Sequence, residues 1–113
     1  MNKKLSFLDE LYQKNADRQI EWDASDKIDV TFKALEFVGE VGEMCNNIKK
    51  VRREELGIKG SRCTREDLES EFGDVMITLA LLADAVGVDL EQVTKEKFNA
   101  TSEKMGFKTK FDM

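Results

Sequence analysis

Two pairs of acidic residues stand three positions apart inside apolar stretches of the chain. Glu40 and Glu43 lie in FVGEVGEMC, and Glu71 and Asp74 lie in EFGDVMITLALL. The spacing alone is weak evidence, because 23 of the 113 residues are acidic. Carboxylates in apolar surroundings cost free energy unless they are paired or bind a metal, and their oxygens suit hard cations such as Mg²⁺ or Mn²⁺. We therefore expect these four side chains to form one magnesium site.

An ordinary charged helix face, with the same acids paired to lysines and arginines, is the alternative interpretation. Three glycines, Gly39, Gly42 and Gly73, stand next to the acids. A glycine inside a helix costs about 1 kcal/mol relative to alanine, so three of them indicate that a helix backbone or a ligand approaches closely. The glycines therefore favour a binding site over a charged face.

The elements that carry these acids are predicted to be helices. The chain has no proline, and its apolar residues recur at spacings of three and four, which is typical of an all-α protein. We expect four helices, over about residues 6–20, 27–55, 64–87 and 89–105. Ser6, Thr64 and Asp89 are the expected N-caps, and Gly57 is the expected stop of the second helix. The whole chain, residues 1–113, is expected to form one domain.

Helical geometry predicts that the acids meet. At about 100° per residue, one stripe of the second helix and one of the third collect polar side chains beside the core face. These are Glu36, Glu40, Glu43 and Asn47 on the second helix, and Asp67, Glu71, Asp74 and Thr78 on the third. If the two helices fold back as a hairpin, Glu43 and Glu71 differ by only about 6 Å along the axis. The two stripes are therefore expected to face each other.

Composition excludes several classes of function. With a net charge of -5, the chain has no basic field for a nucleic-acid polymer, and a triphosphate would need divalent cations to approach it. Histidine is absent, which excludes serine–histidine and cysteine–histidine nucleophiles, histidine zinc sites and carboxylate–histidine di-iron sites. Carboxylates must therefore carry out any acid–base chemistry.

The ends and the apolar runs of the sequence predict a cytoplasmic protein. The start, MNKKLSFLDEL, has no apolar segment of the kind found in signal peptides, and there are only two cysteines. The longest run without a charge, VMITLALLA, is far shorter than the roughly 20 residues needed to cross a bilayer. We expect no membrane partner.

The strings EVGE and EFGD resemble the ExxE and ExxD motifs of the MazG-like nucleoside triphosphate pyrophosphohydrolases, members of the all-α NTP pyrophosphatase superfamily. The similarity extends through LEFVGEVGEMCNNIKK and DLESEFGDVMITLALLADAVGVDLEQV, and covers about residues 15–105. The resemblance implies a fold like a four-helix bundle. It also implies hydrolysis of a (deoxy)nucleoside triphosphate to the monophosphate and pyrophosphate with two or more Mg²⁺ ions, as house-cleaning of the nucleotide pool.

Roles for individual residues follow from the same resemblance. The four acids named above become metal ligands. Lys95 and Asn99 match a downstream lysine and asparagine of the family that contact phosphate or sugar, and Lys95 would add positive charge during catalysis. Glu40 is the expected general base. Some relatives carry an extra glutamate where this chain has Gly39, so Glu36 remains the alternative base.

Two further side chains are candidate substrate contacts. Similar proteins place an aromatic residue against the nucleobase in the connector after the first helix, where this chain has Trp22 in the stretch up to Asp26. Stacking on the indole would serve binding, whereas Trp22 could equally cover the core. Asn47, which continues the acidic stripe, is the second candidate.

The last helix is expected to present its polar face to the substrate. Lys95, Asn99 and Ser102 share one side of that helix, and the opposite side, with Val93 and Thr94, is expected to pack. The tail GFKTKFDM carries two phenylalanines and either docks or frays.

Assembly is predicted from the third helix, which is apolar all round. Ile77 and Leu81 lie on the side away from Leu79 and Leu82, so a second subunit is expected to cover them. Similar proteins form dimers, or tetramers in which neighbouring subunits complete each site. We expect a homotetramer, with a dimer as the alternative.

Two other functions stay open from the sequence. One is a non-enzymatic helical interaction module whose acids are surface charge. The other is a hydrolase of another phosphorylated nucleotide, such as an alarmone. A deoxynucleotide is the expected substrate, but the sequence does not specify its base.

Overall fold

The computed structural model describes residues 5–113, and its regular elements are four helices with no strand among these residues. They are α1 (Phe7–Trp22), α2 (Val30–Glu55), α3 (Arg65–Ala85) and α4 (Leu90–Met105). The all-α prediction is confirmed, and each predicted boundary lies within three residues of the observed one. None of the helices in the described range is both long and apolar enough to cross a membrane.

Side-chain caps begin three of the helices, as predicted. The Ser6 hydroxyl accepts the N–H of Asp9 at 3.2 Å, and the Thr64 hydroxyl accepts the N–H of Asp67 at 3.0 Å. Each aspartate in turn accepts the backbone N–H of its cap residue. Asp89 opens α4 by accepting the N–H of Gln92 at 3.2 Å. These bonds satisfy N–H groups that have no partner within the first helical turn.

The connector between α1 and α2 differs from its prediction. α1 continues to Trp22, so this residue ends a helix and does not lie in the connector, and α2 begins only at Val30. Asp23 stops α1, because its carboxylate accepts the N–H of Ser25 at 3.1 Å and that of Lys27 at 2.8 Å. Asp29 then caps α2 by accepting the N–H of Phe32 at 2.9 Å.

Glycines end α2 and α3 at turns that need a left-handed backbone. Gly57 has φ +68° and Gly87 has φ +74°. After α2, the N–H of Ile58 donates to the carbonyl of Arg53 at 3.0 Å; after α3, the N–H of Val88 donates to the carbonyl of Ala83 at 2.9 Å. This pattern closes the last carbonyls of a helix and favours glycine because glycine has no Cβ.

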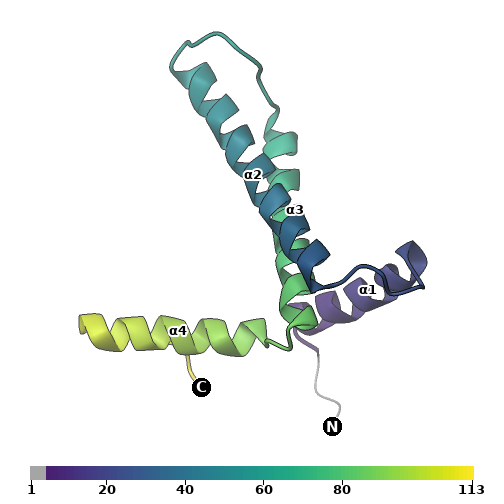
Figure 1. Ribbon diagram of the computed structural model, residues 1–113. Helices are drawn as coiled ribbons and strands as arrows, with labels where there is room; N and C mark the ends of the chain where they lie inside the picture. Colours follow the sequence, from purple (N-terminus) through teal and green to yellow (C-terminus); the bar gives the residue numbers. More distant parts are fainter. Residues whose placement is uncertain (1–4) are drawn as a thin grey trace.

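The helices form a hairpin with two arms. α2 and α3 run antiparallel and make the main helix–helix contact (Figure 1). α1 packs against α3 near the end of the hairpin opposite the α2–α3 loop, which we call the foot of the hairpin (Figure 1). Tyr12 of α1 contacts the start of α4, because its hydroxyl accepts the N–H of Leu90 at 3.0 Å. α4 then leads away from the hairpin (Figure 1). The bundle-like arrangement is therefore not closed within one chain.

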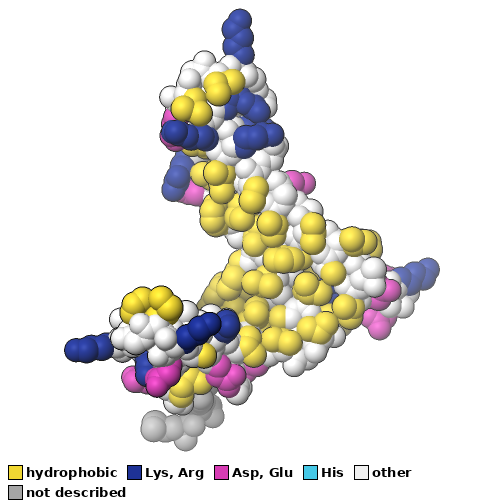
Figure 2. Space-filling view, turned by 60° about the vertical axis from the view of Figure 1, so that its left-hand side comes forward, with side chains coloured by type: hydrophobic (Ala, Val, Ile, Leu, Met, Phe, Trp, Pro, Cys, Tyr) yellow, Lys and Arg dark blue, Asp and Glu magenta, His cyan; other side chains and the backbone are white. Residues whose placement is uncertain are grey.

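The single chain has little core of its own. Among the described residues the buried apolar side chains are Ile28, Leu68, Ala80 and Ala83, and no large side chain is fully buried. The radius of gyration is 17.9 Å, against about 13 Å for a compact chain of this length. The accessible surface is 8743 Å², against about 6,300 Å² for a folded monomer of this mass. Hydrophobic side chains spread along one flank of the hairpin and over its foot (Figure 2).

Candidate metal centre

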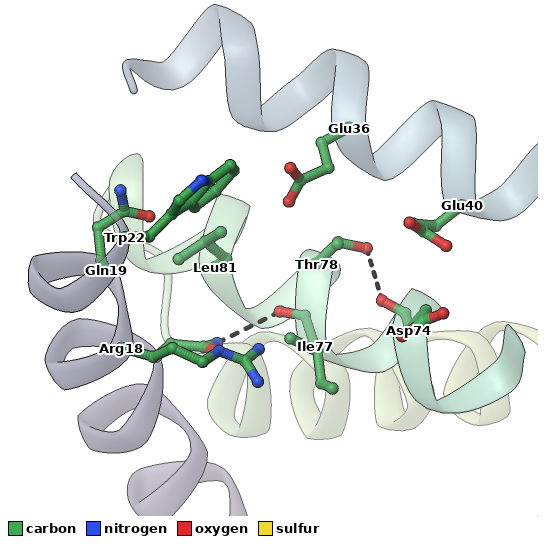
Figure 3. A pocket seen from close by; sticks show the side chains of 10 residues that line it. Arg18, Gln19, Trp22, Glu36, Glu40, Asp74, Ile77, Thr78 and Leu81 are labelled. Carbon is green, nitrogen blue, oxygen red and sulfur yellow. Dashed lines mark hydrogen bonds between the residues drawn. The ribbon is translucent and has the colours of Figure 1, made fainter. Parts of the chain in front are cut away.

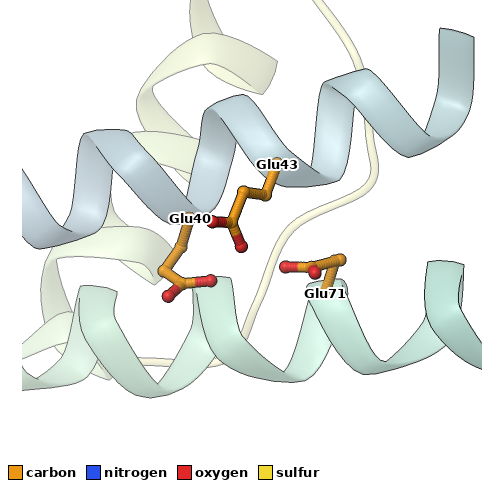
Figure 4. A group of neighbouring side chains, drawn as sticks. All are labelled: Glu40, Glu43 and Glu71. Atoms are coloured by element: carbon orange, nitrogen blue, oxygen red, sulfur yellow. The ribbon is translucent and has the colours of Figure 1, made fainter.

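The antiparallel pairing of α2 and α3 brings three glutamates together. Glu40 and Glu43 project from one face of α2, and Glu71 reaches toward them from α3 (Figure 4). One carboxylate oxygen from each lies within 4.8 Å of the other two. Oxygens that share one Mg²⁺ lie about 2.1 Å from the ion and so at most about 4.2 Å apart. Small rotamer changes would therefore suffice to place all three on one cation.

Electrostatics of this cluster favour a bound cation. Burial, followed by the negative charges of Asp74 and Glu43, raises the pKa of Glu40. Burial and the charge of Glu43 likewise raise the pKa of Glu71. One oxygen of Glu40 and one of Glu71 are buried without a hydrogen-bond partner in the described chain. These carboxylate oxygens only accept hydrogen bonds, lack partners and repel one another, so a divalent cation is a suitable ligand for them.

Pairing with lysines and arginines does not account for these acids. The salt bridges found within residues 5–113 join other acids to their bases: Glu55, Glu69, Glu91 and Glu103. Three of these pairs lie one turn apart on a single helix. The ordinary charged-face interpretation therefore has no support from the contacts of Glu40, Glu43 and Glu71.

Asp74 lies beside the three glutamates and is not one of the converging set. Its backbone carbonyl accepts the hydroxyl of Thr78 at 2.8 Å, and its charge raises the pKa of Glu40 and of Glu71. Asp74 and Glu40 both line a cavity next to the cluster. The sequence placed four acids in one site; the structure groups three and sets Asp74 at the edge of the adjoining cavity.

This cavity, of about 260 Å³, lies between α1, α2 and α3 (Figure 3). Trp22 lines it from the end of α1, and its ring meets that of Phe32 edge-on at 5.8 Å between centroids. Trp22 is 56% exposed, so it does not cover a core. The indole and the acid cluster are thus joined by one cavity.

Three polar residues of α1 that were not predicted from the sequence line the cavity. Asn15 is buried and donates to the carbonyl of Ile77 at 3.3 Å, while Arg18 and Gln19 border the open space. The Gln19 amide nitrogen is buried without a hydrogen-bond partner in the described chain. These three residues and Trp22 are spaced three or four apart, which places them on one face of the helix. This spacing is the sequence pattern from which they could have been predicted as neighbours of Trp22.

Asn47, a predicted substrate contact, braces the hairpin. Its side-chain amide is buried and donates to the backbone carbonyl of Asp67 at 3.4 Å. The backbone carbonyl of Asn47 accepts a hydrogen bond from the thiol of Cys63 at 3.5 Å. Asn47 lies on the acidic stripe, as predicted, but it is not part of the cavity lining.

Lys95 and Asn99 are not brought to the acids within one chain. The Lys95 ammonium lies 3.9 Å from the carboxylate of Glu91, and the side chain lines a different cavity, which Phe111 also lines. The Asn99 carboxamide donates to the carbonyl of Phe111 at 2.8 Å and accepts the N–H of the same residue at 2.7 Å. Their predicted position beside the acids is therefore not found within the described chain.

The orientation predicted for α4 is wrong. Ser102, on the face expected to be open, is buried, whereas Val93 on the opposite face is 41% exposed. The reason is the tail, which returns along α4 and places the Phe111 ring edge-on to that of Phe98 at 5.0 Å. The tail therefore docks, and it covers the polar face.

The glycines beside the acids face open space. A Cβ built on Gly39, Gly42 or Gly73 meets no atom of the chain within 4 Å, apart from its immediate surroundings in the helix. The close approach that these glycines indicate is therefore not made within one chain.

An all-helical protein that sets three glutamates of a helix pair within reach of one cation, beside a cavity, is a candidate metal-dependent hydrolase. Residues 31–110 match the family model of the MazG nucleotide pyrophosphohydrolase domain. This is more than half of the chain, which therefore belongs to that family, as the motifs predicted. The match includes both acid pairs, Lys95 and Asn99, but not Trp22.

A phage protein is also similar. The chain is 37% identical over 70 residues to the Gene 37 protein of Mycobacterium phage L5. This similarity covers 62% of the chain and 60% of the length of the phage protein. The name of the phage protein states no activity.

Proposed function

We propose that this protein hydrolyses (deoxy)nucleoside triphosphates between the α- and β-phosphates in a Mg²⁺-dependent reaction, and releases a monophosphate and pyrophosphate. The observation that carries the proposal is the convergence of Glu40, Glu43 and Glu71 beside the cavity in a chain of the MazG family. Cleansing of the nucleotide pool in the cytoplasm is the proposed role.

The three converging glutamates would hold the first cation, and Asp74 would join them or share a second. Mg²⁺ is the expected ion, with Mn²⁺ as a substitute, because all the donors are carboxylate oxygens. A divalent cation bound there would neutralise charge on phosphate oxygens and polarise a water molecule. Without it, the acids would repel a triphosphate.

The cavity orients the nucleotide. Its acid end suits the phosphates with their cations, and Trp22 at the other end offers an exposed indole on which a base can stack for about 1–3 kcal/mol. Arg18 lines the same cavity and adds a positive charge to it. The family match and the cavity together support a nucleotide as the substrate class.

Glu40 is the proposed general base. Burial and its acidic neighbours raise the pKa of Glu40 above the ordinary value, and a base works best when its pKa is close to the working pH. Glu40 also faces the cavity where the reacting phosphate would lie. Glu36, one turn earlier on α2, is the alternative base.

The proposed assembly is a homotetramer, with a dimer as the alternative, in which α4 of one subunit serves the site of another. The large accessible surface, the exposed Leu35 (68%) and Val38 (65%) on α2, and the open glycine face support such packing. Lys95 and Asn99 of a second copy would then approach the phosphates or the sugar. Substrate would displace the contact that Asn99 makes with the tail.

A panel of ribo- and deoxynucleoside triphosphates with Mg²⁺ tests the proposed reaction, with pyrophosphate and orthophosphate measured separately. We expect pyrophosphate from the wild-type protein, and no pyrophosphate after Glu43→Gln with Asp74→Asn. Glu54→Gln, an exposed glutamate near the end of the same helix, is the matched control and should keep full activity. Release of orthophosphate only, or full activity in the double variant, would contradict the proposal.

A further inference from the structure

Glu36 is a carboxylate in the cavity with no partner among the residues that the structure describes. It projects from α2 one turn before Glu40 and points into the cavity (Figure 3). The side chain is half-buried, and it makes no hydrogen bond or salt bridge to any residue of the range 5–113. It does not belong to the three glutamates whose oxygens converge. Nothing within the described chain therefore accounts for a charge at this position.

The position of Glu36 along the cavity corresponds to the middle of a nucleotide. Figure 3 shows Glu36 between Trp22 and Glu40. One helical turn advances about 5.4 Å along the axis, so Glu36 is about that far from the acid end. A nucleotide runs from phosphates through sugar to base. With phosphates at the acids and base on the indole, as the proposed function has them, the sugar lies opposite Glu36.

The chemistry of a carboxylate at this point is selective. An ionised carboxylate only accepts hydrogen bonds, and the groups of a sugar that can donate are its hydroxyls. A phosphate in the same place would bring a second negative charge into a partly buried cavity, where repulsion is weakly screened. Of the hydroxyls, the 3′ group is present in both deoxy- and ribonucleotides.

We propose that Glu36 is a specificity-determining residue that accepts a hydrogen bond from the 3′-hydroxyl of the substrate. The inference rests on the proposed function and names its substrate class: nucleoside triphosphates with a free 3′-hydroxyl. Nucleotides phosphorylated on the 3′ oxygen, the class that includes alarmones, are rejected by charge. This separates the two phosphorylated substrates that the sequence left open.

The test compares pairs of substrates that differ only at the 3′ position. For each base, kcat/KM is measured with Mg²⁺ for the 2′-deoxy and the 2′,3′-dideoxynucleoside triphosphate. Wild-type protein should favour the 3′-hydroxyl by about 10- to 100-fold, as expected for a hydrogen bond to a charged group. Glu36→Ala should bring this ratio close to one. Glu36→Gln, whose amide oxygen still accepts a hydrogen bond without the charge, should give an intermediate ratio.

Glu54→Gln is the matched control on the same helix and should leave the ratio unchanged. An unchanged ratio in both Glu36 variants, with the wild-type protein active, would overturn the inference and leave the proposed function standing. An equal loss of kcat on both substrates would also overturn it, because a general base acts on every substrate alike. If Glu36→Ala does not fold, the ratio in Glu36→Gln decides. No pyrophosphate from any substrate with wild-type protein would overturn the inference and the proposed function together.

Discussion

The α2–α3 hairpin and α4 both carry residues of the proposed site, but they hold them in different ways. In the hairpin, Glu40 and Glu71 approach each other within one chain and leave buried oxygens without partners. In α4, Asn99 is fully engaged by the backbone of Phe111, and Lys95 lies near Glu91. The hairpin acids therefore lack partners within the described chain, as the proposed cation site requires, whereas Asn99 and Lys95 of α4 have contacts that a substrate would have to displace under the proposed function.

The difference follows from how each region is stabilised. The hairpin has a capping box at Thr64, and the Asn47 side chain of α2 donates to the backbone carbonyl of Asp67 on α3, so contacts between its two helices set its register. α4 leads away from the hairpin and finds its own tail as a neighbour. The contact between α2 and α3 therefore brings acids of the proposed site together, whereas α4 does not bring Lys95 or Asn99 to them within the described chain.

Removal of a hairpin carboxylate should have the largest effect. Glu71→Gln keeps the shape of the side chain but removes one of the three converging charges, so pyrophosphate release should fall by about 100-fold or more, as for loss of a central electrostatic contact. Initial rates with a saturating triphosphate and Mg²⁺ measure this. Glu69→Gln, two residues earlier and exposed on α3, is the control. A loss smaller than threefold would show that the cluster is not the reaction centre.

Complementation between two inactive variants tests whether α4 acts on another subunit. Glu71→Gln and Lys95→Ala should each be impaired alone. Co-expressed in equal amounts, they should regain about a quarter of wild-type activity, because half of the randomly mixed dimers contain one intact site made from two chains. Activity of the co-purified mixture is the measurement. No recovery in a confirmed mixed oligomer would place Lys95 in the site of its own chain, or outside any site.

The hairpin acids also predict how stability depends on pH and metal. Folding raises the pKa values of Glu40 and Glu71 above the ordinary value of 4.5, so the folded state binds more protons than the unfolded state just above that pH. Their contribution to stability is therefore lost as pH rises from about 4.5 through the raised pKa values. Mg²⁺ at 100 times its dissociation constant should restore about 2.7 kcal/mol.

Thermal unfolding at pH 5 and pH 7.5, with and without Mg²⁺, measures this dependence. The rise in melting temperature on adding Mg²⁺ should be larger at pH 7.5. Glu71→Gln should melt higher than wild type in the absence of metal and respond less to Mg²⁺, because it removes both the repulsion and a ligand. If Glu71→Gln is less stable than wild type without metal and its melting temperature still rises fully with Mg²⁺, the cluster is not a cation site whose carboxylates repel one another.

The two regions also differ in how far the sequence predicts them. The caps at Ser6, Thr64 and Asp89 and the meeting of Glu43 with Glu71 were predicted, because they depend on residues close together in the chain or on helical register alone. The outward face of α4 was predicted wrongly, because it depends on a tail whose docking no local pattern specifies. The end of α1 was predicted two residues too early, since the carboxylate of Asp23 stops the helix by bonds to Ser25 and Lys27 where no glycine or proline signals a turn.

The smallest expected effect concerns the tail contact of α4. Asn99→Ala removes both hydrogen bonds to Phe111 and should reduce stability by only about 1–2 kcal/mol, because the contact is largely exposed. Hydrogen exchange at the Phe111 amide should become faster, while that of α2 and α3 stays the same. If Asn99 of a second subunit also contacts substrate, Asn99→Ala should raise KM even under conditions in which the variant is fully folded. Deletion of residues 107–113 should leave KM equal or lower. A rise in KM in the deletion variant equal to that in Asn99→Ala would instead show that the docked tail itself supports the site. The tail would then be part of the site on α4, and not a contact of Asn99 that substrate displaces.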